Sequence, residues 1–182
     1  MTDYSDKDLV QLFKGKDTKN FAFNIIVRRH QEKLYWHIRK LVVHHDDADD
    51  ILQNTFIKVW NGLENFREAS KLYTWLYRIA TNETLTFLKQ KKRRYLLSLS
   101  DYENHLQDTL ASDSFFNGDE IQRKLHMAIT KLPEKQRIVF NLKYFEEMKY
   151  DDMAEVLDTS VGALKASYHH AVKKIEKYLK ES

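Results

Sequence analysis

Residues that make turns are too rare in this chain to support a fold of strands and tight turns. Its 182 residues include four Gly and one Pro, Pro133. Most turn types use Gly or Pro at defined positions, whereas Leu, Lys, Glu and Ala, which are abundant here, favour helices. Hydrophobic residues make up 42% of the chain, which is enough for a core. The sequence therefore predicts an all-α protein that is ordered over most of its length.

Apolar residues recur at helical spacing through the first half of the chain, from Leu9 to about Leu88. The pattern predicts helices over Asp6–Gly15, Lys19–Val43, Ala48–Leu63 and Lys71–Arg94. The third helix carries a stripe typical of a buried face, made of Leu52, Phe56, Val59 and Leu63. We therefore predict an N-terminal helical bundle over residues 1–94.

The helical pattern fades between residues 95 and 118, where Ser, Asp, Asn and Gly take over. From Tyr95 to Gln122 the chain has no Lys or Arg but several acidic residues. This composition predicts a flexible, acidic linker. Helical patterning resumes at about Asp119, which predicts a second domain over residues 119–182. The expected architecture is two small helical domains joined by that linker.

The C-terminal domain carries the pattern of a helix-turn-helix. A short amphipathic helix that includes Met153 and Val156 precedes a turn at Asp158–Ser160, and Ser160 is a good N-cap for a longer helix. The residues on one face of that longer helix are Leu164, Tyr168, Ala171, Ile175 and Tyr178. A second helix of this kind enters the DNA major groove.

The opposite face of the longer helix carries small and cationic residues, namely Gly162, Ala166, His169, His170, Lys173 and Lys177. Small residues near its N-terminal end would allow a close approach to base edges, and the lysines suit phosphates. An ordinary helical hairpin with a solvated lysine face would show the same pattern.

A second candidate surface lies on the predicted helix that ends at Arg94. Residues 74–94 read TWLYRIATNETLTFLKQKKRR, which begins with aromatic residues and ends with five cations in six residues. Its core face comprises Leu72, Leu76, Ile79, Ala80 and Phe87, and one flank comprises Trp75, Arg78, Asn82, Lys89 and Arg93. Rings stack on unpaired bases, amides read base edges and cations hold phosphates, so the flank suits single-stranded nucleic acid. The alternative is core aromatics followed by a solvated basic end.

Two blocks of sequence resemble a known family, and together they cover nearly all of the chain. The first is FREASKLYTWLYRIATNETLTFLKQKKRR with the preceding DDADDILQNTFIKVWNGLENF, and the second is ITKLPEKQRIVFNLKYFEEMKYDDMAEVLDTSVGALKASYHHAVKKIEKYL. They resemble the second and fourth conserved regions of sigma factors of bacterial RNA polymerase. The short join, with no third domain, resembles the extracytoplasmic-function (ECF) group of these factors. Asp158 stands where Gly is common in the family, which a turn tolerates.

The resemblance implies a function and a set of site residues. The chain would bind core polymerase, recognise the −35 and −10 promoter elements and initiate transcription, with neither catalytic activity nor a cofactor. The residues expected to bind the clamp of the largest polymerase subunit are Asp50, Gln53, Asn54 and Ile57. Those expected at the −10 element are Asn65, Phe66, Arg67, Lys71, Trp75, Arg78, Asn82, Lys89 and Arg93. Those expected at the −35 element are Lys165, Ala166, Ser167, His169, His170 and Lys173.

The resemblance and the composition also lead to expectations about partners and compartment. ECF relatives are commonly held inactive by an anti-sigma protein, so such a partner is expected beside core polymerase and promoter DNA. The absence of Cys excludes disulfides and thiolate metal sites and allows a reducing cytoplasm. No apolar run approaches the roughly 20 residues needed to span a bilayer. We therefore expect a cytoplasmic protein that does not insert into a membrane.

Three other interpretations remain open at this point. A stand-alone helix-turn-helix regulator would bind DNA without polymerase. A metal-dependent phosphohydrolase could be built on His44, His45, Asp46 and Asp47, although the acidic residues there also suit the first turn of a helix. A helical adaptor would show no DNA affinity that falls with salt.

Overall fold

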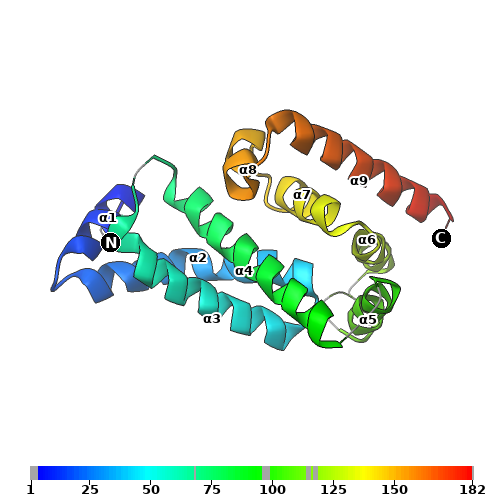
Figure 1. The fold of residues 1–182 in the computed structure, drawn as a ribbon, viewed down its shortest axis with the longest axis horizontal. Coiled ribbons are helices and arrows are strands. Elements are labelled where there is room, and N and C mark those ends of the chain that lie inside the picture. Colours follow the sequence, from blue (N-terminus) through cyan, green and yellow to red (C-terminus); the bar gives the residue numbers. More distant parts are fainter. Residues whose placement is uncertain (1–3, 68, 96–98, 114–115, 117–118, 182) are drawn as a thin grey trace.

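The computed structural model describes residues 4–67, 69–95, 99–113, 116 and 119–181, and these residues form helices and no strands. In chain order the elements are α1 (Asp6–Lys14), α2 (Lys19–Val42), α3 (His45–Gly62), the short 3-10 turn η1 (Leu63–Asn65), α4 (Leu72–Tyr95), α5 (Leu99–Ser112), α6 (Glu120–Thr130), α7 (Glu134–Tyr144), α8 (Tyr150–Leu157) and α9 (Val161–Glu181). The all-α prediction is confirmed, and so is the layout of two helical domains (Figure 1).

The N-terminal domain is a bundle in which α2, α3 and α4 pack against one another and α1 packs on α2. The predicted bounds of α1, α2 and α4 are within one residue of those observed, and α3 begins at His45 rather than Ala48. A turn at Val43 reverses the chain between α2 and α3, because the amide of His44 donates to the carbonyl of Val42 at 2.8 Å. Val43 has φ 65°, a conformation that is rare for a β-branched residue.

The C-terminal domain has the predicted helix-turn-helix. Ser160 caps α9, since its hydroxyl oxygen accepts from the amide of Ala163 at 3.2 Å. Asp158, in the turn, has the left-handed conformation that ends α8. Leu164, Ala171 and Ile175 are the buried residues of α9, as expected. Pro133 immediately precedes α7, a place where its missing amide and fixed φ suit the start of a helix.

The join between the domains differs from the predicted flexible linker. Residues 99–112 form α5, which packs against α6. Leu106 and Leu110, one helical turn apart, are almost fully buried. The sequence did not indicate this helix because these few apolar residues lie among many polar ones, so the helical period is weak.

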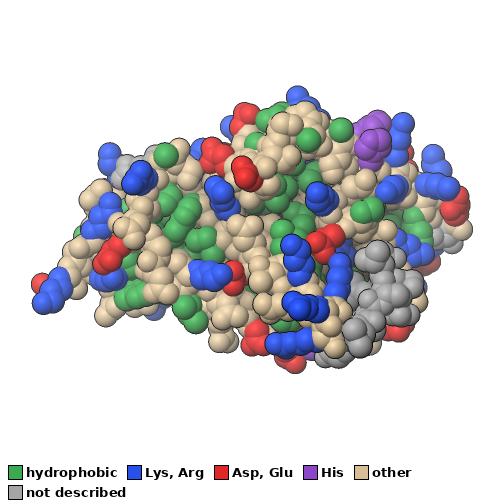
Figure 2. All heavy atoms as spheres, viewed as in Figure 1, with side chains coloured by type: hydrophobic (Ala, Val, Ile, Leu, Met, Phe, Trp, Pro, Cys, Tyr) green, Lys and Arg blue, Asp and Glu red, His purple; other side chains and the backbone are tan. Residues whose placement is uncertain are grey.

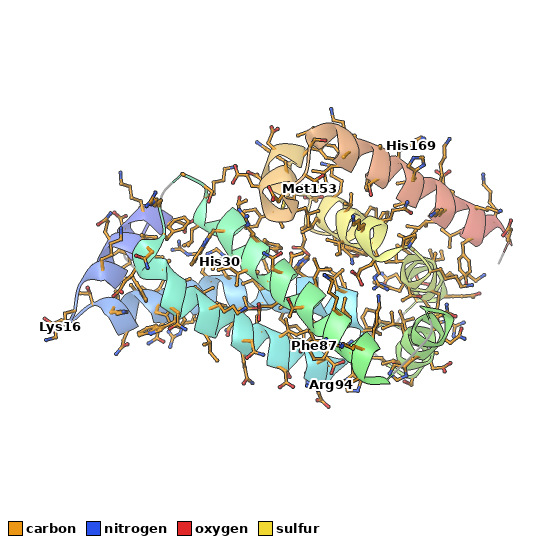
Figure 3. All side chains as sticks on the ribbon, in the orientation of Figure 1. Lys16, His30, Phe87, Arg94, Met153 and His169 are labelled. Carbon is orange, nitrogen blue, oxygen red and sulfur yellow. The ribbon has the colours of Figure 1, made fainter. Side chains whose placement is uncertain are left out.

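A continuous apolar core joins the two domains. One cluster of buried side chains contains residues from the bundle, such as Leu76, together with Leu142, Met153 and Leu164 of the C-terminal domain. Contacts between α4 and α8 and between α2 and α7 hold the domains against each other. Figure 3 labels Met153, whose fully buried side chain lies on α8. A smaller cluster, including Ile129, Phe140 and Ile175, lies within the C-terminal domain.

The loop between α7 and α8 contains a residue whose backbone is strained. Glu147 is exposed and has φ 49°, a left-handed conformation that costs a residue with a Cβ more than it costs Gly. We expect Glu147→Gly to raise the free energy of unfolding by about 0.5–1 kcal/mol. Urea denaturation would measure this change. As a matched control, Glu176→Gly in the middle of α9 should lower stability by about 1 kcal/mol, because Gly disfavours a helix interior.

His126 of α6 should make the fold sensitive to acid. Its ring stacks on Phe145, and burial, with a smaller effect of the nearby Lys40, lowers the pKa of His126 to about 4. Below pH about 6.5 the unfolded chain binds a proton that the folded chain does not, so stability falls as the pH drops toward 4. The substitution His126→Phe keeps an aromatic ring at this position but removes the group that takes up a proton. The unmodified chain should lose free energy of unfolding between pH 7 and pH 5. In the variant this loss should be smaller by on the order of 1 kcal/mol, allowing for the partial exposure of the ring. An unchanged loss would exclude this role for His126.

In the part of the chain that the structure describes, no helix is both long enough and apolar enough to cross a membrane.

Candidate nucleic-acid interface

An apolar groove between α2 and α3 forms the first candidate surface. It has a volume of about 630 Å³, and its lining residues are Phe23, Asn24, Val27, Gln31, Leu52, Gln53, Phe56, Ile57 and Trp60. Ile57 is 58% exposed and lies among the other apolar residues of the groove, so the apolar surface there is contiguous rather than a single exposed side chain. The groove therefore presents apolar surface that the chain itself does not cover.

The predicted buried stripe of α3 needs a correction. Leu52 and Phe56 are half-buried and line the groove, while the fully buried residues of the helix are Ala48, Ile51, Thr55 and Val59. Thr55 occupies the core because its hydroxyl donates to the carbonyl of Ile51 at 2.7 Å, which satisfies its polar group within the helix. The four residues predicted to contact polymerase, Asp50, Gln53, Asn54 and Ile57, are all exposed on α3. Gln53 and Ile57 line the groove itself, so Gln53 lies beside Leu52 and Phe56 and not on the opposite side of the helix.

Trp75, near the start of α4, is held in place by two neighbours. Its ring centroid is 5.0 Å from that of Phe66, which is 7% exposed and so supports Trp75 from the preceding loop. Gly62 lies beneath the ring, since a Cβ added there would be 3.1 Å from Cζ2 of Trp75. Trp75 itself is half-buried. The ring is therefore fixed in position and still partly accessible.

The remaining residues predicted on the flank of α4 are exposed, and they follow Trp75 along one side of the helix. They are Arg78, Asn82, Lys89 and Arg93. Figure 2 shows Lys and Arg side chains gathered over the C-terminal end of α4, and Figure 3 labels Arg94 there. Two other lysines of this end form ion pairs, Lys91 with Asp47 and Lys92 with Glu134. Tyr77 is a core residue instead, at 1% exposure.

Asn65, Arg67 and Lys71 are exposed around the turn that leads into α4. Lys71 pairs with Asp152 of α8 at 3.0 Å. A nearby position of the loop, residue 68, lies outside the described residues. The predicted −10 residues thus lie along one continuous path from η1 to the end of α4.

The third surface is the outward face of α9. Lys165, Ala166, His169, His170 and Lys173 are exposed, and Ser167 is half-buried. Figure 3 labels His169 on the outer side of this helix. The face carries small residues toward its N-terminal end and lysines further along, which is the distribution a major-groove helix needs.

The region proposed for a metal site has other contacts. His45 Nδ1 is 2.6 Å from the hydroxyl of Tyr35, and His45 Nε2 is 3.3 Å from Asp49. Asp47 pairs with Lys91. Among the described residues, no group of three His, Asp or Glu side chains is placed to hold a metal ion.

A helix-turn-helix whose outward face is exposed is typical of a DNA-binding protein. The bundle also carries an aromatic, amide and cationic flank on α4. Comparison with protein families agrees with this class. Residues 26–94 match Sigma-70 region 2, and residues 122–175 match Sigma-70, region 4.

Individual relatives identify the family more closely. The chain is 33% identical over 180 residues to the ECF RNA polymerase sigma-E factor of Haemophilus influenzae, with 94% of each chain covered. It is 33% identical to the RNA polymerase sigma-H factor of Pseudomonas aeruginosa, covering 98% of this chain and 96% of that protein. It is 30% identical to the ECF RNA polymerase sigma factor SigW of Bacillus subtilis, covering 96% of each. The chain belongs to the ECF family of RNA polymerase sigma factors, which bind core polymerase, recognise promoter elements and initiate transcription.

Solved structures share the fold over both domains. CnrH, solved in complex with the cytosolic domain of CnrY, superposes with a TM-score of 0.72 and 24% identity, covering 97% of this chain and 98% of that one. The sigma factor RpoE of Bartonella quintana, solved with the anti-sigma factor NepR, gives a TM-score of 0.68 and 22% identity, covering 87% and 96%.

Proposed function

We propose that this sigma factor divides its work among the three surfaces described above. Residues 1–94 bind core polymerase through α3 and its groove, and they open the −10 element with the flank of α4. Residues 119–182 read the −35 element with α9. Residues 95–118 connect the two domains. The chain catalyses no reaction itself and acts in the cytoplasm, where polymerase and promoter DNA meet.

The main support for the proposal is the arrangement of exposed side chains along the flank of α4. Trp75 is fixed by Phe66 and Gly62 yet remains partly exposed, and Asn82 follows it along the same side of the helix. A rigid ring can take the place of a base that leaves the stack, and an amide can read a base edge. The exposed cations further along, Lys89 and Arg93, suit the phosphates of the opened strand.

A regulatory partner is part of the same proposal. One protein of this fold was solved with an anti-sigma factor. A protein that covered the groove between α2 and α3 would prevent core binding, and one that covered the flank of α4 would prevent promoter opening. We therefore expect an anti-sigma partner to compete with core polymerase for this chain.

Run-off transcription is the direct test. Purified chain and core polymerase would be incubated with a library of promoter sequences, and the transcripts sequenced. We expect transcripts from a subset of templates that share two elements, and none with core alone. A chain that binds DNA but neither associates with core nor yields transcripts would instead be a stand-alone regulator.

A further inference from the structure

A cavity lies where α2, α4 and the loop after α7 meet, and it belongs to none of the three surfaces described above. Its volume is about 490 Å³, and its lining residues are Glu32, Lys33, Trp36, Lys40, Tyr73, Tyr77, Phe145, Glu146 and Glu147. These residues are distinct from those of the groove and from those assigned to the −10 and −35 elements. Cavities of this size between domains are typical of small-ligand sites.

Aromatic rings form much of the wall of this cavity. Trp36, Tyr73 and Phe145 are half-buried, so part of each ring is accessible, and Tyr77 is buried behind them. The ring centroids of Tyr73 and Tyr77 are 4.8 Å apart, and those of Trp36 and Tyr35 are 5.0 Å apart. The rings are therefore held by neighbours, and the face of an aromatic ring attracts cations.

The lining of the cavity carries more negative than positive groups. The carboxylates are those of Glu32, Glu146 and Glu147, and the ammonium groups are those of Lys33 and Lys40. The side chain of Glu146 is only 10% exposed, so its charge is weakly screened by water. Burial, with the nearby negative charges of Glu146 and Asp152, raises the pKa of Tyr73 to about 12. The surroundings of Tyr73 thus disfavour a further anion and favour a cation.

Lys40 shows how this cavity holds a positive charge. Its ammonium lies 4.6 Å from the centroid of the Phe145 ring and 3.4 Å from a carboxylate oxygen of Glu146. The cavity has further groups of the same two kinds, since the rings of Trp36 and Tyr73 line it. The exposed carboxylates of Glu32 and Glu147 line it as well. Rings and carboxylates are therefore present for a second cation.

The carboxylates do not form a metal site. Among the residues that the structure describes, no group of three His, Asp or Glu side chains is placed to hold a metal ion. Rings contribute nothing to the binding of a hard metal ion, which takes oxygen ligands. They suit instead an organic cation with an apolar surface, and quaternary ammonium ions are recognised by aromatic rings in this way.

We propose that this cavity binds a small organic cation of the quaternary ammonium class. Trp36 and Tyr73 contact its methyl groups, and Glu147 and Glu32 balance its charge. The cation binds beside Lys40, whose own charge is neutralised by Glu146. This site goes beyond the proposed function, because it gives the chain a small-molecule ligand in addition to polymerase and DNA.

The first test uses choline as the probe. Choline chloride would be titrated into the full chain in a calorimeter, with the ionic strength kept constant. We expect saturable binding with a Kd of about 1 mM or tighter, which is within reach of a ligand of this size. Dimethylbutanol, in which a carbon replaces the nitrogen of choline, should bind at least about tenfold more weakly because it has no charge. Absence of choline binding, or equal affinity for both compounds, would overturn the proposal.

Variants of the lining residues locate the site. Trp36→Leu should weaken choline binding about tenfold, whereas Trp36→Phe, which keeps a ring, should stay within about threefold of the unmodified chain. Glu147→Gln should weaken binding about fivefold, because it removes one of the balancing charges. Its control is Glu155→Gln, which makes the same change at an exposed residue of α8 outside the cavity and should have no effect. Equal weakening by both Gln variants, or unchanged binding in Trp36→Leu, would exclude this cavity.

Thermal unfolding gives a second readout on the same proteins. At a choline concentration of ten times its Kd, the Tm of the unmodified chain should rise by about 3–6 °C over that in the same concentration of sodium chloride. Trp36→Leu should show a much smaller rise. An equal rise in both would mean that choline acts through the solvent and not through the cavity. Neither measurement uses polymerase or DNA, so the result is independent of the proposed function.

Discussion

Replacing Ile57 by Glu is expected to weaken binding to core polymerase by about 30-fold or more, which corresponds to about 2 kcal/mol. Ile57 projects at the apolar groove beside Phe56 and Trp60, and a carboxylate there would be buried without a partner on binding. Since the side chain is 58% exposed in the free chain, the fold should tolerate the change. Fluorescence anisotropy of labelled chain titrated with core polymerase would measure the affinity.

Ile121 provides a matched control for this substitution. It is 75% exposed and lies on α6, outside the groove. Ile121→Glu makes the same change of size and charge, and we expect core affinity to stay within about twofold, as for a surface position away from an interface. Equal weakening by both variants would mean that net charge, rather than the groove, governs binding.

Replacing Asn82 by Ala is expected to impair promoter opening by about 1–3 kcal/mol, the value of a lost base-edge contact. Asn82 is exposed on the same flank as Trp75, so its loss should leave folding and core binding intact. Permanganate footprinting of complexes with core polymerase would measure opening. A template that is already melted at the −10 element should restore activity only in part, because opening is supplied and base reading is not.

Two further variants serve as controls for the effect of Asn82→Ala on promoter opening. Asn20→Ala removes another exposed amide, at the start of α2, and should open promoters normally. His170→Ala should weaken binding to a −35 duplex too short to melt, whereas Asn82→Ala should not. If Asn82→Ala opens promoters as the unmodified chain does, the amide has no role in reading the −10 strand.

Outside α5, the sequence predicted the helices well because their apolar residues recur at a regular helical period. Ser160 was predicted as the N-cap of α9, and this is confirmed. Leu164, Ala171 and Ile175 of the predicted face of α9 are buried, and Tyr168 and Tyr178 are partly buried, because the apolar residues of this helix are regularly spaced. The site residues on α3, α4 and α9 came from the family resemblance together with these helix faces, and their assignment stays a prediction.

Other features could not be read from local patterns. The buried face of α3 includes Thr55, whose hydroxyl donates to the carbonyl of Ile51. Because Thr was counted as a polar residue, the predicted buried face was displaced by about one residue from the observed one. The packing of α8 on α4 depends on groups far apart in the chain, such as Lys71 and Asp152. Helical periodicity describes which side of each helix is apolar, but it does not specify which helix of another domain will cover it.

Gly62 has a consequence for how the surfaces of the N-terminal domain act together. It is the last residue of α3, and the ring of Trp75 rests against it. The same helix carries Ile57 about 7.5 Å away along its axis, at 1.5 Å per residue. A helix over so short a span moves as a rigid rod, so docking of α3 on polymerase also sets the position of the floor under Trp75. In the proposed function, attachment of α3 to polymerase and alignment of the Trp75 ring are therefore coupled through one rigid helix. Gly62→Ala would displace the ring while leaving the groove residues unchanged.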